Sequence, residues 1–135
     1  MTTVFAESQA LPNQPTQSRT KRVALWAFQI IVAGLFLMAG GSKLSGAPDM
    51  VALFDAVGIG QWFRYVTGAI EVGSALMLLI PSLAAYGSLL LVATMTGAVL
   101  THLFVIGGSP VGALVFLVAA GIIAWARRNE LTRLF

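Results

Sequence analysis

The chain has 135 residues, of which 58% are hydrophobic and only 10% are charged; soluble domains carry about 25% charged residues, so this composition indicates a membrane protein. The net charge of +3 does not indicate nucleic acid as a partner, because five of the eight basic residues stand in two short runs beside long apolar stretches, Arg19, Lys21, Arg22 and Arg127, Arg128. Cysteine is absent, which excludes disulfides, thiolate nucleophiles, iron–sulfur clusters and thiolate zinc sites.

Residues 1–21 are predicted to be a disordered N-terminal tail, because the stretch up to Ser18 is rich in Thr, Ser, Gln, Asn and Pro and has no sustained apolar pattern. The next stretch, Val23–Ser42, has no charge across 20 residues, about the length that crosses a ~30 Å hydrocarbon core. It is the predicted first membrane span. A cleavable signal peptide is the competing interpretation, and it is disfavoured because the apolar run is long and begins far from Met1.

The connection after this span, from Lys43 to Gln61, is predicted to contain a short amphipathic helix on the outer membrane surface. Its apolar residues recur at helical spacing after an expected Asp49 cap, and Gly58 ends the pattern: Met50, Leu53, Phe54 and Val57. Covering the mouth of the bundle is the favoured role for this helix. Gating the access of a lipid-soluble ligand is the alternative.

Three further spans are predicted at Trp62–Ile80, Ser82–Ile106 and Pro110–Ala126. The links between them are short, which predicts an all-α integral membrane four-helix bundle with up-down-up-down topology over residues 22–127. Basic residues flank both ends of this unit, so both termini, including a short basic tail at 128–135, are expected in the cytoplasm. The expected location is a bacterial inner membrane.

Polar residues inside these spans are the candidates for function. Arg64 and Glu71 are seven residues apart and share one helix face, with Gly68 between them. Glu71 falls near the bilayer midplane, where a lone charge costs at least several kcal/mol. It therefore needs a partner or a wet cavity, and the partners within reach are Lys43, Arg64 and His102.

The set Lys43, Arg64, Glu71 and His102 is predicted to be a ligand or proton site, with Gly68, Thr67 and Thr101 in support. A structural ion-pair cluster that fixes helix register is an equally weighted alternative. No metal site is expected, since a single histidine argues against bis-histidine haem. The small residues Ala93, Gly97 and Thr101, four apart, are interpreted as close helix packing.

Three segments carry a family resemblance: GLFLMAGGSKL (Gly34–Leu44), RYVTGAIEVGSALMLL (Arg64–Leu79) and THLFVIGGSP (Thr101–Pro110). Their order and spacing resemble the DoxX-like family of small four-span membrane proteins, from Val23 to Ala126. The resemblance implies a four-helix transmembrane bundle and a link to quinone-linked membrane oxidation, including thiosulfate:quinone oxidoreductase. The family's recurring polar positions correspond here to Lys43, Arg64, Glu71 and His102, with Gly68 between the second and third.

Two functions from different classes are expected. The first is the membrane subunit of a quinone-linked oxidoreductase assembly, with no covalently bound cofactor, quinone as the ligand, and electrons from a soluble or membrane redox partner. The second is a non-enzymatic membrane scaffold or assembly factor. A small transporter ranks third, because no inverted repeat or discontinuous helix is visible. Membrane lipid is an expected partner in each case, a homo-oligomer is open, and the catalytic residues are unknown.

Overall fold

The computed structural model describes residues 19–132, and this part of the chain is all-helical. It contains six α-helices and one π-helical segment: α1 (Arg19–Ser45), α2 (Pro48–Val57), α3 (Trp62–Leu78), α4 (Ala84–Thr101), η1 (His102–Ile106), α5 (Val111–Ala126) and α6 (Arg128–Leu131). The all-helical class predicted from the sequence is therefore confirmed.

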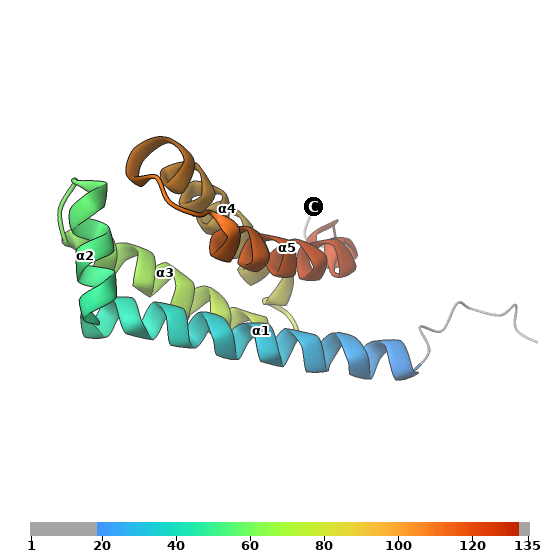
Figure 1. Cartoon of the computed structure of the whole chain (residues 1–135). Coiled ribbons are helices and arrows are strands. Elements are labelled where there is room, and N and C mark those ends of the chain that lie inside the picture. The colour runs from blue at the N-terminus through green and yellow to red at the C-terminus, as the bar shows by residue number, and fades with distance from the viewer. Residues whose placement is uncertain (1–18, 133–135) are drawn as a thin grey trace, which may run out of the picture.

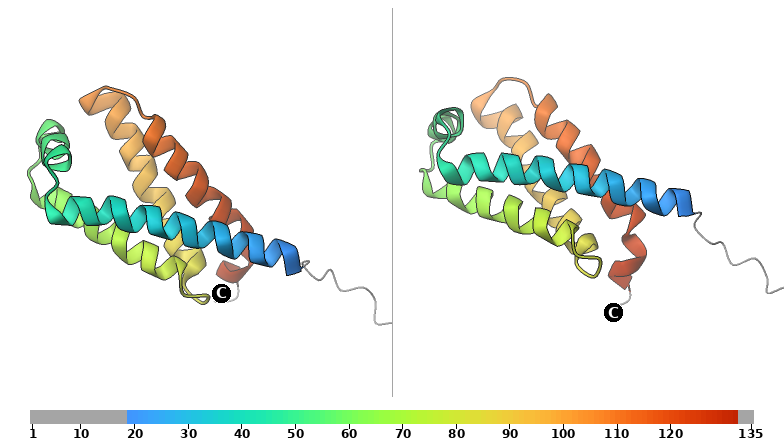
Figure 2. Two further views of the ribbon diagram at one scale, coloured as in Figure 1. Left: turned by 60° about the horizontal axis from the view of Figure 1, so that its bottom comes forward. Right: turned by 90° about the horizontal axis from the view of Figure 1, so that it is seen from below.

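The four long helices form two pairs that splay apart (Figures 1 and 2). Consecutive members α1, α3, α4 and α5 run in alternating directions, and α1 packs along α3 while α4 packs along α5. Helices α3 and α4 join the two pairs, whereas α1 and α5 touch only slightly. The pairs diverge toward the end where α2 lies, so the bundle is narrow at one end and wide at the other.

Small residues determine where the helices approach closely. A Cβ added to Gly87 of α4 would lie 2.7 Å from the Ser74 carbonyl oxygen of α3. The backbones of α3 and α4 can therefore cross at this point only because Gly87 has no side chain. From this crossing, α3 and α4 separate toward the wide end.

An apolar core fills the middle of the bundle, built from Val32, Ala33, Phe36, Ala75, Leu78, Leu91, Met95, Ala120 and Ile123. Large apolar side chains also cover the outside, where Ile31, Met38 and Val115 are each more than half exposed. Two segments, Arg19–Ser45 and Ala84–Ile106, are long and apolar enough to cross a membrane by length and composition. A helix that is apolar on every face suits a lipid environment.

Several predicted boundaries need correction. Residues 19–21, assigned to a disordered tail, are the first residues of α1, and residues 1–18 lie outside the described part of the chain. Helix α3 ends at Leu78 and not at Ile80, because the chain already turns over residues 79–83 around Pro81. The third apolar segment is helical from Ala84 and becomes π-helical at His102. In the predicted basic tail, Arg128–Leu131 form α6, and residues 133–135 lie outside the described range.

The expected Asp49 cap of α2 is wrong, whereas the predicted end at Gly58 is confirmed. Ala47 is the N-cap residue, and none of the side chains in the described part of the chain caps this helix. Pro48 explains the difference, because its fixed φ angle suits the first helical position and it has no N–H to be capped. Gly58 adopts a φ of +87°, in the left-handed region that favours glycine, and its N–H donates to the Phe54 carbonyl.

Candidate functional site

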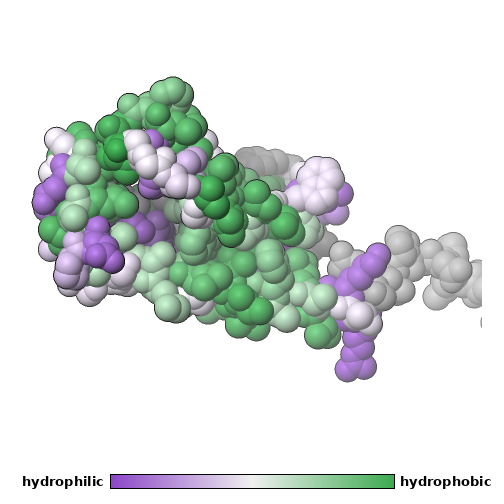
Figure 3. All heavy atoms as spheres, viewed as in Figure 1, coloured by the Kyte–Doolittle hydropathy of each residue, from purple (hydrophilic) through white to green (hydrophobic). Residues whose placement is uncertain are grey.

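A cavity of about 420 Å³ lies at the wide end of the bundle. Residues from α1, α2, α3, α4, η1 and α5 line this cavity, which lies half open between the two diverging helix pairs. Figure 3 shows the corresponding hollow, with hydrophilic surface set inside a mainly hydrophobic face. Four aromatic rings contribute to its wall: Phe36, Phe54, Phe63 and Phe116. Within residues 19–132, six polar side chains line the cavity: Lys43, Thr67, Glu71, Thr94, Thr101 and His102.

An ion pair between α1 and α3 stands at the wall of this cavity. The Lys43 Nζ atom lies 3.0 Å from Glu71 Oε2. The Glu71 side chain is only 1% exposed, whereas that of Lys43 is 14% exposed. Glu71 is thus almost fully buried and Lys43 is partly exposed, and both residues line the cavity. Of the predicted partners for Glu71, Lys43 is the one that it binds.

Close packing of α1 against α3 brings these two residues together. A Cβ added to Gly68 would lie 3.0 Å from the Gly40 carbonyl oxygen and 3.0 Å from Lys43 Cβ. A Cβ on Gly40 would lie 2.9 Å from the Gly68 carbonyl oxygen. The two glycines face each other, so the helix backbones approach until Lys43 reaches Glu71. Helix α1 occupies the space beside Gly68.

Arg64 shares the helix face of Glu71 but binds the end of α1 and not the Glu71 carboxylate. Its guanidinium donates to the backbone carbonyl of Lys43 and, through Nε, to Gln61 Oε1 at 2.7 Å. Its Cζ atom also lies 4.3 Å from the centre of the Tyr65 ring. Lys43 is in the last turn of α1, where backbone carbonyls lack helical partners, so Arg64 caps this helix end. Arg64 is not among the residues that line the cavity.

His102 lines the cavity from the side of η1. Its Nδ1 atom lies 2.9 Å from the Ala98 carbonyl oxygen, one turn back along the chain. His102 is the first residue of the π-helical segment, a form of helix that occurs frequently at functional sites. The structure therefore brings Lys43, Glu71 and His102 to one cavity, together with Thr67 and Thr101.

Helix α2 covers the wide end of the cavity. The four residues that were predicted to form its apolar face, Met50, Leu53, Phe54 and Val57, all line the cavity. The ring of Phe54 packs edge to face on Phe63 of α3, with 5.8 Å between the ring centres. The side-chain amide of Gln61 donates to the Val51 carbonyl at 3.0 Å and to Asp55 Oδ1 at 2.7 Å. These contacts fix α2 to the start of α3.

The small residues Ala93, Gly97 and Thr101 do not make the close helix packing that was predicted for them. All three line the cavity, and a Cβ added to Gly97 would have nothing within 4 Å. The reason is the splay of α3 away from α4 beyond the crossing at Gly87. The stripe therefore faces the cavity and not a neighbouring backbone.

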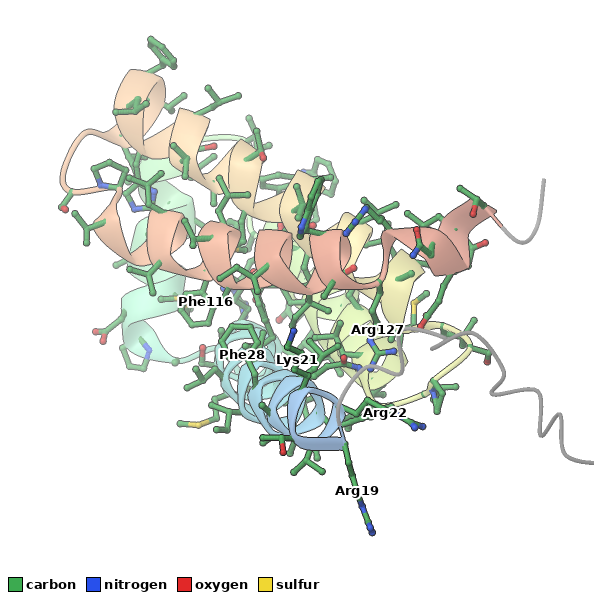
Figure 4. The ribbon with its side chains drawn as sticks, turned by 90° about the vertical axis from the view of Figure 1, so that its right-hand side faces the viewer. Arg19, Lys21, Arg22, Phe28, Phe116 and Arg127 are labelled. Carbon is green, nitrogen blue, oxygen red and sulfur yellow. The ribbon has the colours of Figure 1, made fainter. Side chains whose placement is uncertain are left out.

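A second polar cluster, at the narrow end, was missed by the sequence analysis. Arg127 Nε donates to Gln29 Oε1 at 2.6 Å, and the Gln29 amide donates to the backbone carbonyl of Leu78. This cluster joins α1, the end of α3 and the end of α5, and Figure 4 shows Arg127 reaching toward α1. Arg127 also pairs with Glu130 at 2.9 Å and stacks over the Trp26 ring at 4.8 Å. The available signal was Gln29, a lone polar residue in an apolar span.

Comparison with known proteins identifies one family. A model described as the DoxX-like family matches residues 27–127, a range that includes every polar residue of the cavity wall. No curated protein and no solved structure matches the chain.

Proposed function

Because this chain belongs to the DoxX-like family and is a membrane protein, we propose that its cavity binds a quinone and that it is the membrane subunit of a quinone-linked oxidoreductase assembly. The proposal has three parts: the orientation of the helices in the membrane, the chemistry of the cavity, and the source of electrons.

In the proposed orientation, the four spans are α1, α3, α4 with η1, and α5. Helix α3 has 17 residues and is about 25 Å long, which is short for a span but sufficient in a locally thin bilayer. The basic residues at the start of α1 and at the end of α5 lie at one end of the bundle (Figure 4). By the positive-inside rule this end is cytoplasmic, so both termini are placed in the cytoplasm of the cell and α2 lies at the outer surface of its inner membrane.

The observation that carries the proposal is the Lys43–Glu71 pair in the wall of a largely apolar, aromatic-lined cavity. A quinone has a flat apolar ring with two carbonyl acceptors. The ammonium of Lys43 has three hydrogens, of which Glu71 uses one, so it can donate another to a quinone carbonyl. The cavity volume of about 420 Å³ is in the usual range for ligand pockets.

Reduction of a quinone to a quinol adds two electrons and two protons, the protons to the two carbonyl oxygens. Glu71 and His102 are the groups at the cavity that can hand protons to or from the ring. The electrons are assigned to a soluble or membrane redox partner, because the chain has no cysteine with which to bind an iron–sulfur cluster.

A non-enzymatic scaffold or assembly factor is the second candidate, and one observation favours it. Arg64 and Lys43 tie the end of α1 to α3 through bonds that need no ligand. In that case the polar cluster has only a structural role, and substitution of Glu71 changes stability alone.

The test uses three forms of the protein purified in native-lipid particles: the wild type, Glu71→Gln, and Gln29→Leu as the matched control. Gln29 is buried and hydrogen-bonded like Glu71, but it does not line the cavity. Each sample is extracted and its quinone is quantified by mass spectrometry, and the thermal midpoint of each is recorded.

We expect quinone near one molecule per chain in the wild type and in Gln29→Leu, and less than a tenth of that in Glu71→Gln. Gln29→Leu lowers the thermal midpoint, so retention of quinone in this variant separates binding from stability. A wild type that carries no quinone and takes up none on addition would refute the quinone proposal. An early-melting Glu71→Gln would then support the scaffold.

A further inference from the structure

The tautomer of His102 follows from its hydrogen bond. A backbone carbonyl oxygen can only accept, so the proton between Nδ1 and Ala98 must be carried by Nδ1. In a neutral imidazole the other nitrogen, Nε2, is then unprotonated and can only accept. Within residues 19–132, the hydrogen bond through Nδ1 is the one that the His102 ring makes. His102 therefore offers an acceptor toward a ligand in the cavity.

The threonines of the cavity are arranged in the same way. Three of them donate their hydroxyl hydrogen to the carbonyl four residues back: Thr67 to Phe63 at 2.8 Å, Thr94 to Leu90 at 2.8 Å, and Thr101 to Gly97 at 2.8 Å. Each hydroxyl oxygen keeps lone pairs but has no hydrogen left to offer. Four of the six polar side chains in the lining, including His102, have thus committed their proton to the backbone.

The remaining two polar side chains leave the lining with more hydrogen-bond acceptors than donors. Glu71 is an acceptor, and it is held by Lys43. Among the lining residues that the structure describes, Lys43 is the one strong donor. A ligand that fills the cavity and hydrogen-bonds to these side chains must therefore supply most of the hydrogen-bond donors.

We propose that the cavity selects the hydroxyl-bearing, reduced form of its aromatic ligand, a quinol, and that His102 Nε2 accepts a hydrogen bond from one ring hydroxyl. This inference rests on the proposed function and deepens it by assigning the redox form that is bound. The four phenylalanine rings of the wall match an aromatic ring better than an aliphatic alcohol. Lys43 binds the oxygen of the second hydroxyl, which can accept as well as donate.

The first experiment reads the tautomer directly. His102 is the one histidine of the 135-residue chain, so protein labelled with ¹⁵N-histidine gives a single pair of ring signals. Solid-state NMR in native-lipid particles at about pH 8 distinguishes protonated from unprotonated ring nitrogens. We expect Nδ1 to be protonated and Nε2 to be unprotonated. The opposite assignment would overturn the inference whether or not any ligand binds.

The second experiment compares three probes under anaerobic conditions: tetramethylhydroquinone, its dimethyl ether, and tetramethylbenzoquinone. They share one ring and differ in whether they can donate hydrogen bonds. We expect the hydroquinone to shift the Nε2 signal and to bind about fivefold more tightly than either other probe, the effect of one net hydrogen bond. Dodecanol, an aliphatic hydroxyl donor, is expected not to shift the Nε2 signal.

Two variants test which residues cause the preference for the hydroquinone. His102→Phe is expected to abolish the preference for the hydroquinone over its ether. Thr101→Val, which removes an acceptor from the lining, is expected to weaken hydroquinone binding about fivefold. The matched control is Thr96→Val, because Thr96 also donates to the carbonyl four residues back, at 2.7 Å, but does not line the cavity. If His102→Phe fails to fold, Thr101→Val against Thr96→Val still tests the acceptor-rich lining.

The outcomes separate this inference from the proposed function. Equal affinity for the hydroquinone and the benzoquinone overturns the inference but leaves quinone binding intact. A shift of the Nε2 signal by dodecanol as large as that by the hydroquinone overturns the claim that the ligand is aromatic and identifies a lipid hydroxyl as the ligand. Absence of binding by all the probes overturns the proposed function and the inference together, while the NMR signals still establish the tautomer.

Discussion

The ion pair between Lys43 and Glu71 permits a quantitative test of how the wide end of the bundle is held. Replacement of Lys43 by Met keeps an unbranched side chain one atom shorter but leaves the Glu71 carboxylate, 1% exposed, without its partner at 3.0 Å. Breaking a buried pair from one side typically costs 3–5 kcal/mol, and we expect about 3 kcal/mol here. Glu71→Gln is expected to cost less, about 1–2 kcal/mol, because Lys43 is 14% exposed and its long stem can carry the charge toward water.

The double variant Lys43→Met/Glu71→Gln removes both charges, so we expect it to be more stable than the sum of the single losses predicts, by about 1–2 kcal/mol. Unfolding of each form is followed in mixed micelles by denaturant titration, with the slope checked for constancy across the four proteins. Gly73→Ala, on an exposed face of α3 away from the cavity, controls for general effects of substitution in this helix. Strictly additive losses would refute the conclusion that the two side chains stabilise each other.

Three other substitutions test the packing and the second polar cluster, each read by thermal unfolding of the purified protein. Gly87→Ala should destabilise the protein by about 1–3 kcal/mol, because the added Cβ would lie 2.7 Å from a carbonyl oxygen. Gly73→Ala, whose Cβ would have nothing described within 4 Å, should stabilise the protein by about 0.5–1 kcal/mol. Equal effects of the two substitutions would contradict the close crossing of α3 and α4 at Gly87. Arg127→Met should lower the free energy of unfolding by about 1–3 kcal/mol, since it leaves the buried amide oxygen of Gln29 without its donor. An unchanged free energy of unfolding would show that water replaces the arginine. Phe54→Ala should lower the free energy of unfolding by about 3 kcal/mol and speed hydrogen exchange in α2, because Phe54, 4% exposed, holds this helix over the cavity. Unchanged hydrogen exchange in α2 would contradict that role of Phe54.

The helices were predictable because the apolar runs are long and are interrupted by strong breakers. Pro81 and the glycines around Gly107 separate segments that the structure also separates, and the spacing of Met50 and Phe54 predicted the face of α2 that meets the cavity. The pairing of Glu71 was predictable as a requirement, because a carboxylate in an apolar span needs a partner. Which residue serves as the partner depends on how closely α1 and α3 approach.

That approach depends on distances between helices, which periodicity within one helix does not contain. Gly40 and Gly68 are 28 residues apart, and only their meeting in space explains why Lys43 reaches Glu71 while Arg64 turns to a backbone carbonyl. The splay of α3 from α4 has the same origin, and it changed the environment of Gly97 from helix packing to cavity wall. The four-span topology, the membrane orientation and the ligand stay predictions.

The cluster of Gln29, Arg127 and Leu78 has a consequence for how the chain is made. Gln29 and Arg127 are 98 residues apart, so in the proposed orientation the amide of Gln29 enters the membrane long before the ribosome has synthesised its partner. Until then the first helix carries a buried polar group whose bonding is incomplete, and such a helix is held in place only loosely. Arg127, at the end of α5, therefore fixes α1 in place only when synthesis is nearly complete. A nascent chain that stops short of Arg127 should remain a substrate for membrane quality-control proteases.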